Sequence, residues 1–437
     1  MADASDTTGS GIAPRRSILS ALEIDLRLLG MIGAFALLCA AFGVYTAFYA
    51  ANNFLSPRNL FNITIQTVSV AIMATGMVFV IVTRNIDLSV GSVLAMSSAV
   101  MAMLQVQWLP SGLGIGIGHP LVAPLTILLG LVVGTSIGAF QGWLTGYQGI
   151  PSFIVTLGGL SVWRYCAYYT SGGQTQAPLD RTILLLGGAE GTLGPTWSWV
   201  VGALLAAVAV GVIWSGRLAK SRHGFVVKPI AAEAVLSLIV AVAILGFIAI
   251  LNAYPVPEGR LRRIFEARGE TVPEGYSVGT GLPISVLILI VVAVVMTLIA
   301  RKTRFGRYIF AAGGNPDAAT LSGIDTRWLT VKVFALMGFL SGLSAIISQA
   351  RLQSHANDIG TLDELSVIAA AVIGGTALSG GVGTIWGAIL GALIMQSLRS
   401  GMGMVGVDSP LQGIVVGIVL VIAVWLDILY RKRLGVR

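Results

Sequence analysis

Long apolar runs separated by short polar segments recur along the chain. Each run is close to the ~20 residues that a helix needs to cross ~30 Å of hydrocarbon. Open strands would leave backbone groups unpaired in lipid, so we expect helices. The runs lie at 29–51, 66–83, 90–106, 121–146, 151–170, 196–215, 231–251, 282–300, 331–350, 366–378, 383–398 and 411–429. The pairs 66–83/90–106 and 366–378/383–398 are short and joined by polar or glycine-rich turns, which is compatible with broken or re-entrant segments. The pattern predicts an all-α, polytopic transmembrane helix bundle of 10–12 spans.

Composition supports a membrane protein. Hydrophobic residues make up 55% of the 437 residues and charged residues only 11%, whereas a soluble domain carries about a quarter charged residues. The mean hydropathy is +0.87. The net charge of +8 is distributed in a way that favours the membrane surface and lipid rather than nucleic acid.

Basic residues predict the orientation of the bundle. They concentrate in three segments that we expect on the cytoplasmic side: Arg217, Lys220, Arg222, Lys228; Arg301, Lys302, Arg304, Arg307; and Arg431, Lys432, Arg433, Arg437. The first of these segments, 217–228, contains no acidic residue. In 252–281, by contrast, arginines and glutamates balance. This is the positive-inside pattern. It predicts a cytoplasmic tail at 1–28, a membrane domain at 29–430 with a periplasmic loop at 252–281, and a second cytoplasmic tail at 431–437.

Glycines recur at helical spacing on several spans. They are Gly130, Gly134, Gly138, Gly142 and Gly146; Gly383, Gly387 and Gly391; Gly338 and Gly342; and Gly413 and Gly417. Small residues on one face let membrane helices approach closely. The stripes therefore predict helix contacts, either static or sliding during transport.

The sequence lacks the residue patterns of an enzyme. No lysine follows a glycine, so the phosphate loop of ATP-hydrolysing proteins is absent. The histidines His119, His223 and His355 are scattered, without the spacing of metal ligands. We expect a transport protein that binds no cofactor itself.

A few polar residues within or beside the apolar runs are candidates for function, because such residues are costly in a membrane. Asn85, Gln141, Ser152 and Thr156 lie near the inner ends of their runs, and Arg164 lies in the outer third of its run. We predict that they border a substrate pathway, with Arg164 ordering its outer part through backbone or tyrosine contacts. The alternative is that all five cap or bridge helices. For Arg84, Asn85 and Asp87, a local salt bridge or a helix cap is the competing interpretation.

Few buried acids are expected, which argues against a pump driven by protons or sodium.

The segment 301–330 is too polar to cross the membrane. Gly313–Pro316 reads as a turn, and a short helix is expected after it, with proline first and an early acid. On the inner face, such a helix would be accessible to a soluble partner.

Four blocks of sequence resemble the permease subunits of bacterial ABC sugar importers, of the ribose/xylose group in the superfamily shared with branched-chain amino acid permeases. The blocks are NIDLSVGS at 85–92, GIPSFIVTLG at 149–158, GGNPDAA at 313–319 continuing through SGI at 322–324, and IGGTALSGG at 373–381.

The resemblance implies a homodimer in the bacterial inner membrane, with both termini cytoplasmic. ATP-binding subunits, which carry ATP and Mg²⁺, would dock below, and a periplasmic sugar-binding protein would dock above. It also implies a coupling region that contacts the ATPase. That region comprises Gly313, Gly314, Asn315, Pro316, Asp317, Ala318, Ala319, Leu321, Ser322 and Gly323.

The chain departs from ribose-type permeases by an extra portion around 217–300, which is similar to xylose permeases. D-xylose is therefore the first choice of substrate. A branched-chain amino acid permease and a secondary transporter remain alternatives, and a lipid-processing enzyme would need an acid/histidine cluster that the sequence lacks.

Overall fold

The computed structural model describes residues 26–50, 52–225, 227–266 and 269–433, and nearly all of their regular structure is helical. Most of the tails expected at 1–28 and 431–437 therefore lie outside the described residues. The chain divides into two compact units, one containing Trp199–Ala249 and the other Arg27–Ser198 with Ile250–Arg437.

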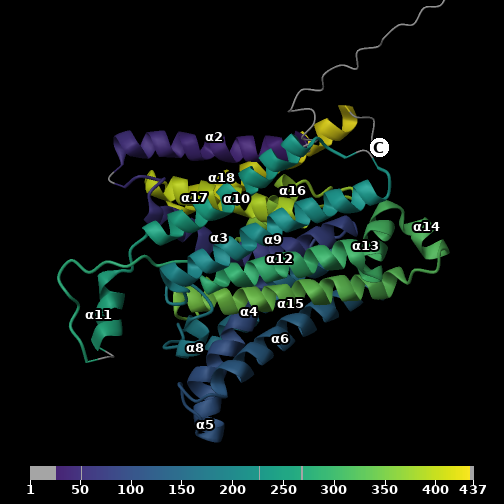
Figure 1. Ribbon diagram of the computed structural model, residues 1–437. Coiled ribbons are helices and arrows are strands. Elements are labelled where there is room, and N and C mark those ends of the chain that lie inside the picture. The colour runs from purple at the N-terminus through teal and green to yellow at the C-terminus, as the bar shows by residue number, and fades with distance from the viewer. Residues whose placement is uncertain (1–25, 51, 226, 267–268, 434–437) are drawn as a thin grey trace, which may run out of the picture. The chain divides into compact units, whose positions relative to one another are not determined.

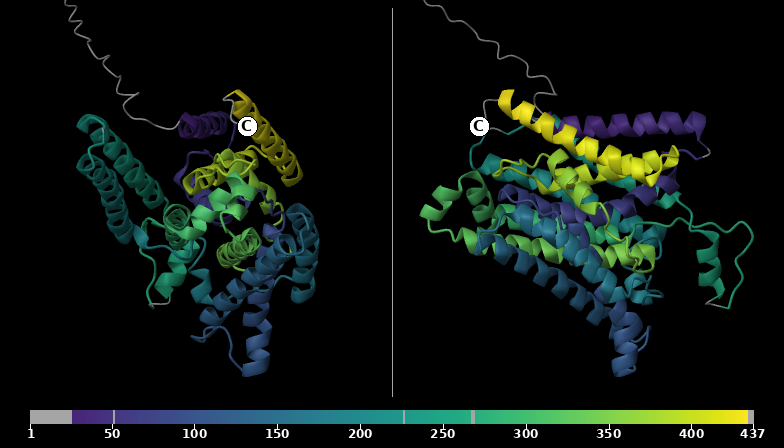
Figure 2. Two further views of the ribbon diagram at one scale, coloured as in Figure 1. Left: turned by 90° about the vertical axis from the view of Figure 1, so that its right-hand side faces the viewer. Right: turned by 180° about the vertical axis from the view of Figure 1, so that it is seen from behind.

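The larger unit is a bundle of long helices (Figure 1). The long helices are α2 (Leu26–Tyr49), α3 (Pro57–Val82), α4 (Val90–Met103), α6 (Val122–Gly146), α7 (Ser152–Ser171), α12 (Ile284–Lys302), α15 (Thr326–Leu352), α17 (Ile385–Met404) and α18 (Ser409–Arg433). Shorter elements are the π-helix η1 (Leu104–Trp108), α5 (Leu109–Leu113), α8 (Arg181–Leu184), α11 (Glu258–Glu266), α13 (Arg304–Gly314), α14 (Pro316–Leu321) and α16 (Asp363–Ile373). α13 and α14 lie at one end of the long helices, and α5, α8 and α11 lie at the other (Figures 1 and 2).

The smaller unit is a hairpin formed by most of α9 (Gly194–Arg222) and α10 (Ile230–Ala253). Within it, Gly202 packs against Ile248. Arg217 pairs with Glu233 at 3.3 Å near the turn of the hairpin. α10 lies within 217–300, the portion predicted to be additional relative to ribose-type permeases.

Among the described residues, eight helices are long and apolar enough to cross a membrane. α7, α17 and α18 are also at least 20 residues long but do not belong to these eight. The polytopic all-α class is confirmed, and the number of 10–12 spans stays a prediction. α16 has only 11 residues and rises ~16 Å, about half of the hydrocarbon thickness. It is a broken segment of the kind expected at 366–378.

The re-entrant alternative for 66–83 is wrong. α3 begins at Pro57, where Ser56 accepts a hydrogen bond from the Asn59 amide and proline occupies the first turn. The helix has 26 residues, and 94% of its most apolar stretch of 18 residues is buried. α3 therefore forms the core of the larger unit, packed against α15, α16 and α17.

The glycine stripe on α6 packs against α15, as predicted. A Cβ at Gly134 would lie 2.4 Å from the Gly338 oxygen, and one at Gly138 would lie 2.1 Å from the Phe334 oxygen. Gly387 and Gly391 likewise approach α16. The expectation for the pair on α18 is wrong, because Gly417 has nothing within 4 Å of a Cβ and Gly413 has only a side-chain atom at 3.5 Å.

Candidate functional site

The segment 301–330 forms two short helices between α12 and α15. Thr303 caps α13 by accepting from the Gly306 amide, and Asn315 caps α14 by accepting from the Ala318 amide. The expected turn at Gly313–Pro316 is therefore partly wrong, since Gly313 and Gly314 are the last residues of α13. The expected short helix after Pro316 is confirmed.

α14 protrudes with an apolar residue at its tip. Leu321 is 89% exposed, more than any other large hydrophobic residue described. Ala318, Ser322 and Gly323 are exposed as well, whereas Ala319 is buried. An exposed leucine on a protruding short helix beside the basic segment is accessible to a soluble protein.

Arg84 connects the end of α3 to the end of α13. Its Nε donates to the Gly313 oxygen at 2.8 Å and its Nη2 to the Gly314 oxygen at 2.8 Å. These carbonyls at the end of α13 have no intrahelical partner, and a cation there also meets the negative end of the helix dipole. Arg84 holds this position with a backbone φ of 62°, unusual for a residue other than glycine. Among the described residues Arg84 forms no ion pair with Asp87, so the local salt bridge considered for it is wrong. Arg84 instead caps the end of a distant helix, α13.

A glycine-rich loop completes this junction. The Gly381 amide donates to the Val82 oxygen at 3.0 Å. A Cβ at Gly313 would lie 1.8 Å from the same oxygen, so no larger residue fits there without moving a backbone. The ends of α3 and α13 and the loop 374–384 thus meet at one end of the bundle, next to α14.

Three of the predicted pathway residues converge on the turn that follows Arg84. The Ile86 amide donates to Ser152 Oγ at 3.3 Å, and Thr156 Oγ1 donates to the Ile86 oxygen at 3.2 Å. Ser89 Oγ donates to Gln141 Oε1 at 3.0 Å. Gln141 is 2% exposed and Thr156 is 0% exposed. In this conformation they bridge α6 and α7 to the turn, as the helix-bridging alternative describes, and their place in a pathway stays a prediction.

The turn itself is organised by Asp87. Asp87 Oδ1 accepts from the amide and from the hydroxyl of Ser89 at 2.8 and 2.6 Å. Burial raises the pKa of Asp87, and the bonds from Ser89 oppose that shift. Asn85 Nδ2 donates to the oxygens of Thr83 at 3.1 and 3.2 Å. Asp87 thus orders the start of α4, although the N-cap position itself belongs to Ser89.

Arg164 reaches the loop between α15 and α16. Its Nη1 donates to the Ile359 oxygen at 2.6 Å and to the Asn357 oxygen at 3.3 Å. The backbone contacts expected of Arg164 are therefore present, while its role in a pathway stays a prediction. Glu364 is buried, and it lies close enough to Arg164 for the two charges to interact. Among the described residues the buried acids are Asp87, Asp180, Glu233 and Glu364, each before or within the first turn of a helix. This agrees with the expectation that buried acids are few.

His355 ties the same loop to the segment after α7. Its backbone pairs with Gln176 in both directions at 2.9 and 3.0 Å, and its Nδ1 lies 3.0 Å from Ser98 Oγ. Burial lowers the pKa of His355 to about 4, aided by the charge of Arg164 and opposed by Asp358. The ring is therefore neutral at physiological pH. Within the described residues, no group of acids, histidines and cysteines is suited to hold a metal ion.

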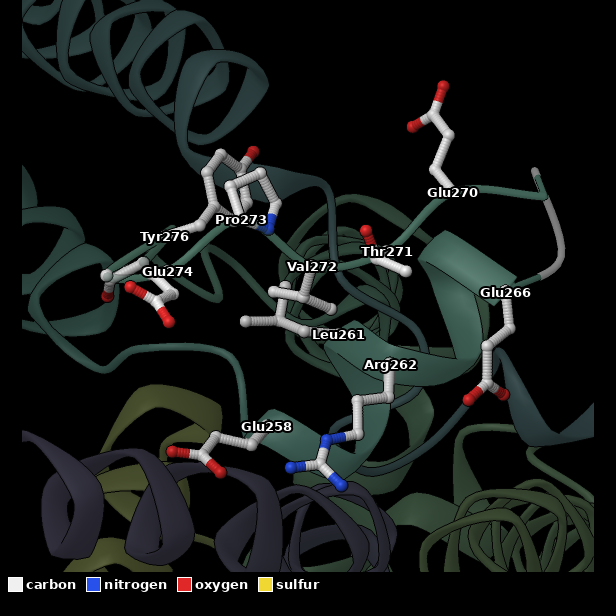
Figure 3. Close-up of a pocket in the computed structure, with 12 residues that line it drawn as sticks. Glu258, Leu261, Arg262, Glu266, Glu270, Thr271, Val272, Pro273, Glu274 and Tyr276 are labelled. Carbon is white, nitrogen blue, oxygen red and sulfur yellow. The ribbon is translucent and has the colours of Figure 1, made fainter.

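The loop 252–281 contains a hollow of about 700 Å³ formed by α11 and residues 270–277. Figure 3 shows the carboxylates of Glu258, Glu266, Glu270 and Glu274 pointing in different directions, with apolar Leu261 between them. A small-molecule site needs polar groups that converge. The hollow therefore lacks the geometry of a substrate site.

α11 is fastened to the segment before α9. Arg260 donates to the backbone oxygens of Ala189 and Glu190, and Arg263 pairs with the Glu190 carboxylate at 2.9 Å. These contacts give a structural role to two of the arginines in the loop, for which the sequence showed only that arginines and glutamates balance.

A bundle of apolar helices with a protruding, clamped helix pair at one end defines a membrane permease. The family model for the permease component of branched-chain amino acid transport systems matches residues 59–183 and 181–424. The chain therefore belongs to this family, and it is a multi-pass transport component rather than an enzyme.

Individual relatives refine this placement. The chain is 37% identical over 380 residues to the xylose transport system permease protein of Escherichia coli (strain K12), covering 87% of each chain. It is 35% identical over 416 residues to the corresponding protein of Haemophilus influenzae, covering 94% of this chain and 99% of the relative. Identity to the ribose import permease protein of Escherichia coli (strain K12) is 31% over 376 residues, 86% of this chain and 87% of the relative. No solved structure matches the chain significantly.

Proposed function

We propose that the chain is the permease subunit of an ATP-driven importer that carries a monosaccharide, D-xylose, across the bacterial inner membrane. The observation that carries this proposal is the 35–37% identity to xylose permeases over 87–94% of the chain, against 31% to a ribose permease.

The partners follow from family membership and from the two ends of the bundle. A separate ATPase subunit, holding ATP and Mg²⁺, docks on the coupling region around α14, where Leu321 is exposed. A substrate-binding protein docks at the opposite end, where α5, α8 and α11 lie. A second copy of the chain completes the pathway, and lipid covers the remaining apolar surface.

The orientation follows from charge. The segments that carry Arg217, Arg301 and Arg431 are cytoplasmic, and so are both termini. α14 then faces the cytoplasm, where an ATPase is available, and α11 faces the periplasm.

Uptake in cells tests the substrate. The chain is expressed with its ATPase and binding protein in a strain that lacks its own xylose transporters, and labelled D-xylose is followed. We expect uptake that excess D-xylose suppresses more strongly than D-ribose or L-leucine. A matched control carries an ATPase variant that binds ATP without hydrolysing it.

The same cells separate the alternatives. Uptake that survives the inactive ATPase and collapses with a protonophore would identify a secondary transporter. Uptake of L-leucine in place of D-xylose would identify an amino acid permease. The substrate assignment fails if labelled D-xylose does not accumulate above the control.

A further inference from the structure

A cavity of about 520 Å³ lies among the ends of α3, α15, α16 and α17 and the loop 354–361. Its volume is within the ~300–1,000 Å³ of small-molecule sites. α15 has 27 residues and rises ~40 Å along its length. The cavity wall at Arg351 is therefore at the opposite end of the bundle from α14, on the side assigned to the binding protein.

Amides from two helices form one wall. Gln396 Nε2 donates to Gln66 Oε1 at 2.6 Å, which joins α17 to α3. This bond uses neither the NH₂ group of Gln66 nor the carbonyl oxygen of Gln396. One donor and one acceptor thus lie side by side at the cavity, the pair that a sugar hydroxyl needs because it both donates and accepts.

Charged side chains form the other walls, and their charges cancel. Arg399 lies 3.6 Å from the Asp363 carboxylate and donates to the Leu362 oxygen at 3.3 Å. Arg351 and the exposed Asp358 add one charge of each sign. Two arginines and two aspartates leave the lining formally neutral. A charged solute would meet the paired Arg399 and Asp363 and a lining without net charge, whereas a neutral polyol gains hydrogen bonds to both signs.

Hydroxyls form the floor. Ser69 Oγ lies 2.6 Å from Ser344 Oγ and 2.8 Å from Ser348 Oγ, and all three serines are buried. Ser69 and Ser348 line the cavity, and Ser344 continues the hydroxyl cluster one helical turn further inward along α15. The polar lining therefore extends from the outer loop into the helix bundle between α3 and α15.

We propose that this cavity is an outer receiving site for a neutral monosaccharide, occupied after release from the binding protein and before passage through the membrane. The inference rests on the proposed function. Apart from the donor and acceptor of the amide pair, its walls are hydrogen-bonded to one another. A sugar must therefore exchange most existing bonds for new ones, each worth little net. The site is consequently weak. Weak binding suits a receiving site, because a tightly held sugar would not move on.

Saturation-transfer NMR on the purified full-length chain in lipid nanodiscs tests the site, because it detects weak ligands. The probe is D-xylose, with D-ribose and L-leucine as comparisons. We expect transfer to D-xylose and little transfer to L-leucine. Gln66→Met and Gln396→Met remove the amide pair at nearly constant volume, and each is expected to raise the Kd by about fivefold per hydrogen bond lost.

Two further variants control for folding. Gln174→Met makes the same change at an exposed position on the outer side of the bundle, away from the cavity, and should bind D-xylose normally. Asp358→Ala removes an acceptor from the exposed loop without disturbing the core, and should also weaken binding.

The proposal is overturned if the wild-type chain shows no transfer to D-xylose or D-ribose, or if the cavity variants bind as Gln174→Met does. Failure of the proposed function looks different. If D-xylose uptake is absent in cells while the nanodisc chain binds D-ribose through Gln66 and Gln396, the substrate is wrong and the receiving site stands. If uptake is normal and binding is absent, the site is wrong and the function stands.

Discussion

Replacing Gly138 by alanine is expected to force α6 and α15 apart. The new Cβ would lie 2.1 Å from the Phe334 oxygen, 2.9 Å from its carbonyl carbon and 3.1 Å from Gly338 Cα. A comfortable C···O contact is about 3.3 Å, so the backbones must separate by roughly 1.2 Å, the difference between 3.3 and 2.1 Å. Because the obstacle is backbone, no side chain can rotate to make room.

The separation is costly along the whole stripe. A gap of about 1 Å forfeits a quarter to a half of the van der Waals attraction at each contact. Overpacking a core by one group costs about 3 kcal/mol at the upper end of the common range. We therefore expect the melting temperature of Gly138→Ala in detergent to fall by at least about 5 °C, and Gly138→Leu to fall further and lose transport.

Gly33→Ala is the matched control. Gly33 is exposed on α2, and nothing lies within 4 Å of the Cβ it would gain. Since alanine is the better helix former, this variant should be as stable as the native chain or slightly more so. If Gly138→Ala melts and transports as Gly33→Ala does, the stripe on α6 faces lipid and the packing described is incorrect.

Three other expectations follow from the junction and the loops. Leu321→Asp should lower substrate-stimulated ATP hydrolysis by about tenfold while the melting temperature stays unchanged. Ala318→Arg should act in the same direction. Normal stimulation in these variants would place the ATPase contact elsewhere. Arg84→Gly relaxes the positive φ but loses both bonds to α13, so transport per ATP hydrolysed should fall, and an unaltered ratio would show that the clamp is not needed. The pKa of His355 is lowered from 6.5 to about 4, so between these values the unfolded chain binds a proton that the folded chain excludes. The free energy of unfolding should therefore decrease by up to about 3 kcal/mol as the pH is lowered from 6.5 to about 4. A His355→Gln variant whose melting temperature varies with pH as steeply as the native chain's would contradict that.

Local signals in the sequence predicted the features that depend on local physics. Span positions follow from the length of apolar runs, and the start of α14 follows from Asn315 before Pro316. The stripe on α6 follows from spacing alone. The start of α3 was missed although Ser56 and Pro57 form a recognisable helix start, because the residues after them are more polar than the rest of the span.

The contacts that sequence could not predict join distant segments. Arg84 bonds to residues 229 and 230 positions away, and no local pattern distinguishes a carbonyl of α13 from a nearby carboxylate as its partner. The outer cavity depends on Gln66 and Gln396, which lie 330 positions apart. Each looks like an isolated polar residue in an apolar run until the helices are packed.

The close crossing of α6 and α15 also has a mechanical consequence. Gly338 lies 12 residues after Thr326 and 14 before Leu352, so about 20 Å of helix extends on each side of it. A tightly packed crossing near the midpoint acts as the fulcrum of a lever. A tilt of about 5° at this point would move the two ends of α15 by roughly 1.7 Å in opposite directions. If the end of α15 next to α14 is displaced, its other end, at Arg351 in the wall of the outer cavity, would therefore move by a similar distance in the opposite direction.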